Sequence, residues 1–133
     1  MASKYKDYYQ TTQRAYHCTV NGKLRKLVIR SKQLANKKNL EHTLTNEDVF
    51  SMWEAQGGRC AKTGLKLDPE TGTVANRNPY GPSLDRIDSD LGYTPENVQL
   101  VCCHYNLAKA AYSEEQFRLL ALAYLESNNI NKS

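Results

Sequence analysis

The chain has 133 residues, of which 40% are hydrophobic and 24% are charged, a balance typical of one soluble globular domain with at most an added arm. It contains no apolar run near the roughly 18 residues that a membrane-spanning helix needs, and residues 1–10 lack the apolar segment of a secretory signal. These features exclude a membrane protein and favour an intracellular, cytoplasmic one.

The formal net charge of +4 is unevenly distributed along the chain. Residues 1–39 hold ten Lys or Arg and one acidic residue, a charge of +9, whereas the remainder holds eight basic and thirteen acidic residues, a charge of −5. This asymmetry indicates an arm that binds a polyanion, joined to a metal-binding body. A basic helix that is merely solvated is the alternative, and charge alone does not separate the two.

The first predicted element follows a polar, Tyr-rich segment and a turn signal at Asn21-Gly22. An apolar stripe at helical spacing then predicts an amphipathic helix over residues 23–38. We therefore assign residues 1–44 to a basic N-terminal arm that faces the phosphates of a polyanion. The predicted phosphate contacts are Lys23, Arg25, Lys26, Arg30, Lys32, Lys37 and Lys38.

A second helix is predicted to begin at Thr45, which can cap it together with Asp48, and to end at Gly57-Gly58. Turn signals flank short extended segments as far as residue 82. Residues 83–88 and 97–102 then predict two strands joined by a loop, because the second is rich in β-branched and apolar side chains.

Two further helices are predicted after these strands. The first covers residues 103–112, where alanines favour a helix. The second is capped by Ser113 with Gln116 three residues later, and Phe117 and Leu120 belong to its apolar face. We interpret that face as packing against the core.

Asp85 on the first strand and Asn106 near the start of the following helix can form a small metal site. A strand–loop–strand–helix unit brings these positions together although they are 21 residues apart in the sequence. Asp supplies an anionic oxygen and Asn a neutral one, which suits Mg²⁺ (or Mn²⁺) with further ligands from water and phosphate. Such a cation favours phosphodiester cleavage. The alternative is a turn-capping Asp and a helix-end Asn.

These residues belong to an ordered set that resembles a known family. The set comprises Asp85-Arg86-Ile87-Asp88, Gly92-Tyr93, the run from Asn97 to Cys102, Asn106, Lys109, and upstream the run from Gly57 to Gly64. It is similar to the HNH endonucleases of the ββα-metal fold, many of them phage-encoded, over residues 57–110 and more weakly over residues 23–56. The resemblance implies an α+β fold, in which a ββα-metal (HNH) core and a C-terminal helix occupy residues 45–133, preceded by the basic arm.

The resemblance also implies roles for single residues. Asp85 and Asn106 would ligate the metal, and Asn97 would hold the loop by hydrogen bonds to backbone. The family's first His, which activates water, is here Arg86. Arg stays protonated at ordinary pH and cannot be a conventional general base, but it can clamp the scissile phosphate. A similar Asp-Arg variant occurs in some rare-cutting restriction enzymes, which also resemble this chain in having a Tyr after the loop.

The proton acceptor must therefore be another side chain, or water on the metal. We prefer His42, which precedes the second helix and could fold over the site; the alternative is a surface or capping histidine. His104 lies about 200° around its helix from Asn106, so both cannot face one metal. Tyr93 is a candidate for contacting the phosphate or positioning water, or it is a packed loop aromatic.

A structural zinc site is not expected. Many relatives carry two CxxC pairs, but the corresponding pairs here are Cys60 with Thr63 and Cys102 with Tyr105, so one ligand is missing from each. We predict that the two cysteines pack as small apolar residues.

The sequence as a whole predicts a metal-dependent endonuclease that hydrolyses DNA by nicking or double-strand cleavage. Its partner would be DNA and not a membrane, it would act as a monomer or homodimer, and it would work in the host cytoplasm if phage-encoded. Because Arg86 replaces the usual base, a catalytically degenerate HNH-fold protein that only binds DNA is the alternative. A small zinc-binding regulatory module is a third possibility, which the incomplete cysteine pairs disfavour.

Overall fold

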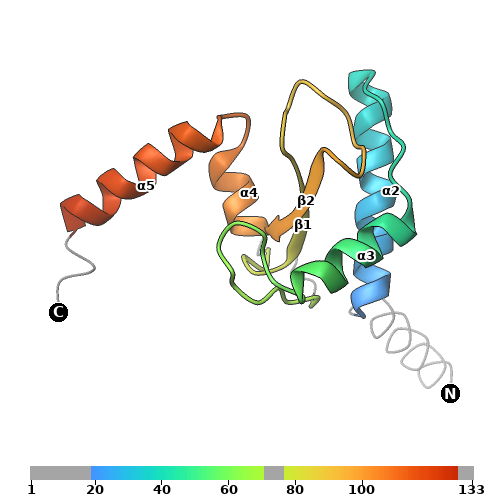
Figure 1. Ribbon diagram of the computed structural model, residues 1–133, viewed down its shortest axis with the longest axis horizontal. Helices are drawn as coiled ribbons and strands as arrows, with labels where there is room; N and C mark the ends of the chain where they lie inside the picture. Colours follow the sequence, from blue (N-terminus) through green and yellow to red (C-terminus); the bar gives the residue numbers. More distant parts are fainter. Residues whose placement is uncertain (1–18, 71–76, 129–133) are drawn as a thin grey trace, which may run out of the picture.

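Two helices, a two-stranded sheet and two further helices follow one another along the chain, as seen in a computed structural model that describes residues 19–70 and 77–128 (Figure 1). Residues 1–18 of the predicted arm, His17 included, lie outside the described part. No described helix is long and apolar enough to cross a membrane. The elements are α2 (Val20–Lys38), α3 (Asn46–Gln56), β1 (Pro82–Arg86), β2 (Val98–Cys102), α4 (Cys103–Lys109) and α5 (Glu114–Asn128).

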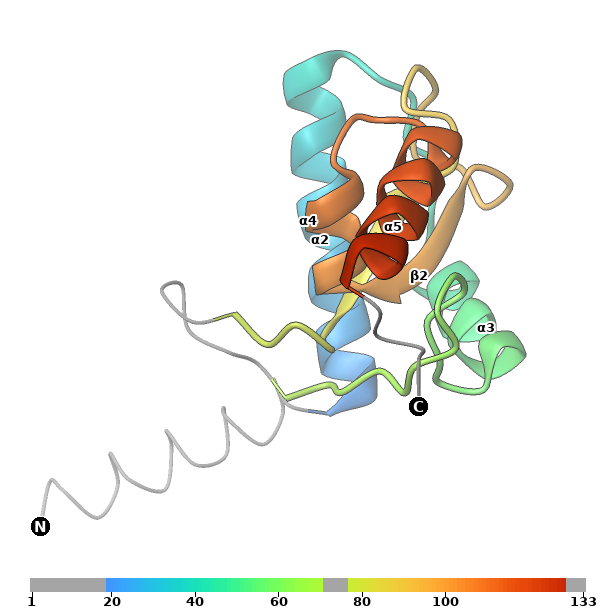
Figure 2. The same cartoon turned by 90° about the vertical axis from the view of Figure 1, so that its left-hand side faces the viewer.

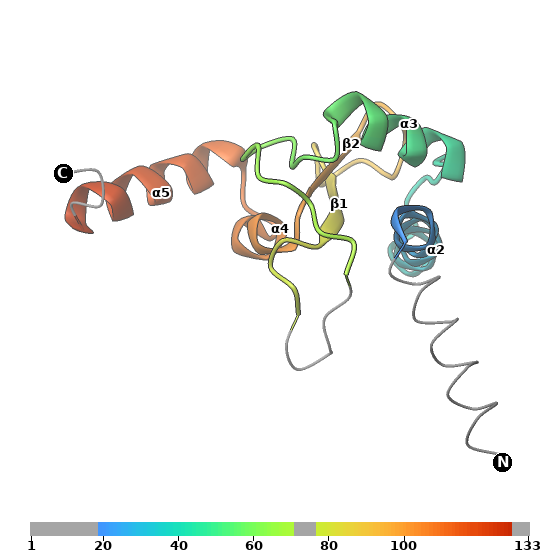
Figure 3. The same ribbon diagram turned by 90° about the horizontal axis from the view of Figure 1, so that it is seen from below.

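The two strands form an antiparallel sheet in which Asp85 pairs with Gln99 and Arg86 with Val98. Leu100 and Val101 of β2 are fully buried. The sheet lies between α2 and α4, as both Figure 1 and Figure 3 show. This α+β arrangement agrees with the predicted fold class at the level of helices packed on a small sheet.

Helix α2 begins earlier than the sequence predicted, at Val20, and runs through the Asn21-Gly22 turn signal. The Thr19 hydroxyl accepts a hydrogen bond from the Gly22 backbone nitrogen at 3.1 Å and caps the helix. Leu24 and Ala35 are buried, so this part of the predicted arm packs into the core.

Helix α3 begins and ends where the sequence predicted. Thr45 and Asp48 form both hydrogen bonds of the capping box, and Gly57 ends the helix in the left-handed conformation, with φ of 62°. Gln56 connects this helix to β2, because its side chain donates to the Leu100 oxygen at 2.9 Å and accepts from the Leu100 nitrogen at 3.2 Å.

Helix α4 is shorter than predicted and ends at Lys109, because Ala110 turns to a positive φ of 49°. Alanine favours helix and does not signal such an end. Ser113 then caps α5 as predicted, since its hydroxyl accepts from the Gln116 nitrogen at 3.2 Å.

The interpretation of the α5 apolar face as core packing was wrong. No residue of α5 is buried, and Leu119 and Leu120 are 58% and 65% exposed. Figures 1 and 3 show α5 running away from the sheet after its first turn, and in Figure 2 it points toward the viewer. Phe117 packs partly against the core and meets the Tyr105 ring edge-on at 5.1 Å. Periodicity defines an apolar face, but the direction of the chain decides whether anything covers it.

Candidate active site

A pocket of about 270 Å³ opens where α2, β1 and α4 meet. It brings together Asp85, Arg86, Tyr93 and Asn106, the residues that the motif predicted, with Arg30 of the basic helix. The complete lining is Leu27, Arg30, Ser31, Leu34, Arg77, Ser83, Leu84, Asp85, Arg86, Ser89, Tyr93, Cys103, Asn106, Leu107 and Ala110.

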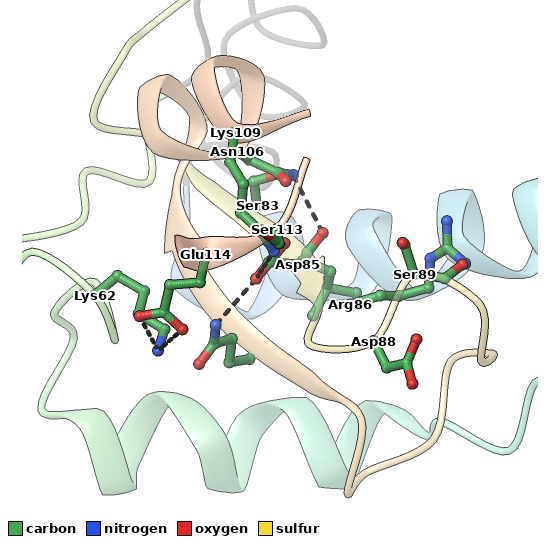
Figure 4. Close-up of polar contacts among 12 residues, drawn as sticks. Lys62, Ser83, Asp85, Arg86, Asp88, Ser89, Asn106, Lys109, Ser113 and Glu114 are labelled. Atoms are coloured by element: carbon green, nitrogen blue, oxygen red, sulfur yellow. Dashed lines mark hydrogen bonds and ion pairs between the residues drawn. The ribbon is translucent and has the colours of Figure 1, made fainter. Parts of the chain in front are cut away.

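The Asp85 carboxylate is buried, with 4% of its side chain exposed, and it is fully engaged by neighbours. Lys109 Nζ lies 3.0 Å from Oδ1 and 3.3 Å from Oδ2, and Gln99 Nε2 donates to Oδ2 at 3.0 Å. Figure 4 shows Lys109 reaching down from α4 to Asp85 on β1. Lys109 belongs to the motif, but its type and position in the sequence predicted no role for it.

The Asn106 side chain lines this pocket and is held in a fixed orientation by its nitrogen. Its Nδ2 donates to the Ser83 hydroxyl at 2.7 Å and to the Leu84 backbone oxygen at 3.2 Å. Within residues 19–70 and 77–128 no hydrogen bond engages Asn106 Oδ1. An amide oriented by its nitrogen and left with a free oxygen beside a carboxylate is a suitable donor pair for a hard cation.

The donor set fits a cation that takes few protein ligands. The described residues contain no group of three or more His, Cys, Asp or Glu that could enclose a metal. Mg²⁺ and Mn²⁺ accept one or two protein oxygens and fill their other positions with water and phosphate. Asp85 and Asn106 therefore fit such an ion but not a closed zinc site.

Arg86 is held in place at the edge of the pocket. Its Nη1 donates to the Ser89 and Leu91 backbone oxygens at 2.6 and 3.0 Å, and its guanidinium lies 5.3 Å from the centre of the Tyr93 ring. In Figure 4 the side chain points away from Lys109, toward the loop at Ser89. Because a guanidinium has further N–H groups, Arg86 can still bind a phosphate in the pocket.

Two more arginines line the same pocket, Arg30 from α2 and Arg77 from the segment before β1. Arg30 is one of the predicted phosphate contacts, whereas Arg77 belongs to neither the motif nor the basic segment and was not predicted. Arg25, also predicted to contact DNA, lies over the Phe50 ring at 5.3 Å instead of facing the pocket. Cationic side chains from three separate segments thus line a pocket that holds one carboxylate, a charge pattern that favours an anion such as phosphate.

His42 does not line the pocket and does not fold over it. Its Nε2 lies 2.8 Å from the Ser31 hydroxyl, and its ring centre is 6.0 Å from that of Tyr93. Ser31 and Tyr93 do line the pocket, so His42 reaches it through these neighbours. Burial, and then the charge of Lys32, hold the pKa of His42 below its usual value of 6.5.

The lowered pKa of His42 predicts a measurable pH dependence of stability. The unfolded chain takes up a proton near pH 6.5 while the folded chain resists it, so stability is lost as pH falls through this range. We expect His42→Gln, which cannot titrate, to lose less free energy of unfolding than the wild type between about pH 7.5 and 5.5. Urea unfolding at both pH values measures the difference, and equal losses in the two proteins would contradict the prediction.

Asn97 closes the loop between the strands. Its Nδ2 donates to the Asp88 and Gly92 oxygens at 3.0 and 2.8 Å, and its Oδ1 accepts from the Asp88 nitrogen at 3.0 Å. These are the backbone hydrogen bonds expected of it. Gly92 lies against the chain at Glu41, whose oxygen would be 2.1 Å from any Cβ added there, and so no larger residue fits.

Cys60 and Cys102 are free and each is 3% exposed, which confirms that they pack within the core. Thr63 lies close to both thiols, and Tyr105 buries its hydroxyl without a hydrogen-bond partner among the described residues. Burial, followed by the charge of Asp85, raises the pKa of Tyr105 to about 12. Neutral side chains thus stand at the positions of the missing ligands.

Comparison with solved structures shows an HNH-like fold. The rare-cutting HNH restriction endonuclease PacI superimposes on this chain with a TM-score of 0.57 and 20% sequence identity, over 79% of this chain and 78% of PacI. No protein-family model matches the sequence, and no curated protein matches it.

Proposed function

We propose that this protein is a metal-dependent endonuclease that hydrolyses DNA phosphodiester bonds. The observation that carries the proposal is the pocket in which Asp85 and Asn106 lie beside three arginines. The HNH-like fold shared with PacI, a restriction endonuclease, supports it. Metal ligands together with anion-binding groups are what phosphodiester hydrolysis requires.

The two oxygen ligands and the three arginines of the pocket have separate parts in this proposal. Asp85 and Asn106 would hold Mg²⁺ or Mn²⁺. When bound, the cation would supply charge neutralisation at the scissile phosphate and at the leaving oxygen. Arg86 clamps the phosphate from its fixed position, and Arg30 and Arg77 orient it. The remaining basic residues of α2 contact the DNA backbone, which makes binding sensitive to salt.

His42 is the proposed proton acceptor, acting through Ser31. Its lowered pKa keeps the imidazole neutral near pH 7. The Ser31 hydroxyl donates to the Val28 backbone oxygen at 2.7 Å and lies 2.8 Å from His42 Nε2, so the relay requires this hydroxyl to turn from Val28 to Nε2 while its oxygen takes a proton from water in the pocket. Removal of either residue should lower the rate by a similar factor, about 10² or more. Cleavage by His42→Ala at the wild-type rate would show that the assignment is wrong.

The proposed activity is tested by cleavage of supercoiled plasmid with Mg²⁺ or Mn²⁺. Asp85→Ala and Asn106→Ala should not cut, whereas Arg118→Gln should cut like the wild type, because Arg118 is an exposed cation of α5 outside the pocket. If the purified wild type cuts under no divalent metal, the enzyme hypothesis fails. DNA binding without cleavage would then favour the catalytically degenerate alternative, which Arg86 supports because it replaces the usual general base.

Replacing Arg86 should reveal its clamping role. We expect Arg86→Ala to lower kcat by about 10²–10³, the effect of removing one preorganised donor from a charged transition state. Arg86→Lys should recover little, because lysine lacks the planar fork that both holds the loop oxygens and reaches the phosphate. Single-turnover cleavage measures the rates, and a Lys variant with full activity would contradict the prediction.

A further inference from the structure

The ion pair between Lys109 and Asp85 occupies the carboxylate that the proposed function assigns to a metal. Both side chains are almost completely buried, with 8% and 4% exposed, and the ammonium group reaches both carboxylate oxygens. The pair joins α4 to β1, and the same helix carries Asn106 three residues earlier. A cation bound by Asp85 and Asn106 would therefore have the Lys109 charge as its immediate neighbour.

The charges in and around this pocket disfavour the binding of a divalent cation. Arg30, Arg77 and Arg86 line the pocket, and Lys109 is paired with its carboxylate, so four positive groups lie in or beside a pocket that holds one carboxylate. Repulsion between charges a few ångströms apart is strong, and partial burial weakens its screening by water and salt. The hydrogen bond from Gln99 further reduces the capacity of Asp85 Oδ2 to accept a metal.

We infer that Lys109 is a built-in counter-ion that competes with the divalent cation for Asp85. This inference rests on the proposed function. In the free protein Lys109 keeps the buried carboxylate neutralised and holds metal affinity low. A DNA phosphate in the pocket adds the negative charge that offsets the arginines, so the metal binds better to the protein–DNA complex than to the protein alone. Lys109 is thus a positioning residue that couples metal binding to substrate binding.

The aliphatic part of Lys109 makes a neutral replacement feasible. Lys109 lines a groove between α4 and α5 with Ala108, Tyr112 and Phe117, so an unbranched apolar side chain is accommodated there. Methionine keeps the length of the stem and removes the charge. Lys109→Arg is the matched control, because it retains the positive charge next to Asp85.

The experiment is a titration of Mn²⁺ into the free protein, followed by electron paramagnetic resonance of the unbound ion. We expect Lys109→Met to bind Mn²⁺ about tenfold more tightly than the wild type, and Lys109→Arg to bind like the wild type. A short DNA duplex is then added to the protein in Ca²⁺, and the Ca²⁺ is exchanged for Mn²⁺ only when the measurement starts. The duplex should tighten Mn²⁺ binding in the wild type more than in Lys109→Met. Such a difference is a readout that a merely structural role would not produce.

The outcomes separate this inference from the proposed function. If the wild type binds Mn²⁺ and cuts DNA while Lys109→Met has the same Kd for Mn²⁺ or a larger one, the counter-ion role is overturned and the nuclease proposal stands. If no protein binds Mn²⁺ with or without DNA, both fail. If Lys109→Met does not fold without metal, Lys109→Gln replaces it, because its amide can donate to Asp85 without carrying a charge. Lys109→Gln is also expected to bind Mn²⁺ more tightly than the wild type, and the absence of this effect overturns the inference.

Discussion

Asp85→Ala is expected to lower the free energy of unfolding by about 3–5 kcal/mol, in addition to abolishing cleavage. The substitution leaves the Lys109 ammonium, 8% exposed, without its carboxylate. A buried charge that loses its partner costs far more than an exposed ion pair contributes, because water cannot reach it. Urea unfolding measures the loss, and a midpoint equal to that of the wild type would contradict the burial of the pair.

The double variant Asp85→Leu/Lys109→Met distinguishes the two effects of this substitution. Replacing both members by apolar side chains removes the stranded charge, so most of the stability should return. Cleavage should not return, because the proposed anionic metal ligand is still absent. A double-mutant cycle on unfolding free energies gives the coupling between the two positions. Recovery of activity together with stability would show that Asp85 is needed only for folding.

Asn97→Ala should lower the free energy of unfolding by about 3 kcal/mol although Asn97 does not line the pocket. Its side chain makes hydrogen bonds to three backbone groups, the Asp88 nitrogen and oxygen and the Gly92 oxygen, and alanine leaves all three without these partners. The same loop supplies the oxygens that hold Arg86. Cleavage should therefore fall as the loop loses its shape.

Asn128→Ala is the matched control for this substitution. Asn128 is exposed near the end of α5, and its side chain donates one hydrogen bond, to the Tyr124 oxygen. Its loss should change stability by less than about 0.5 kcal/mol. Asn97→Asp should be intermediate, because a carboxylate keeps the acceptor for Asp88 but loses both donors. Equal thermal unfolding of the Asn97→Ala and Asn128→Ala proteins would contradict the assignment.

The sequence by itself determined the features that depend on contacts a few residues apart. The capping boxes at Thr45 and Ser113 and the helix end at Gly57 all formed as predicted. Each is a hydrogen bond or backbone preference within a single turn, so residue type and spacing are sufficient. The order of strands and helices, together with the motif, likewise placed Asp85 and Asn106 in one pocket.

Only the tertiary structure decided which distant groups meet. The partner of Asp85 is Lys109, 24 residues away, and Arg77 joins the pocket from a segment without any motif. His42 lies behind Ser31, and the apolar residues of α5 remain exposed. These outcomes depend on how the backbone arranges separate elements in space. Periodicity describes each element by itself, so it does not predict which residues become buried between elements or which charges pair.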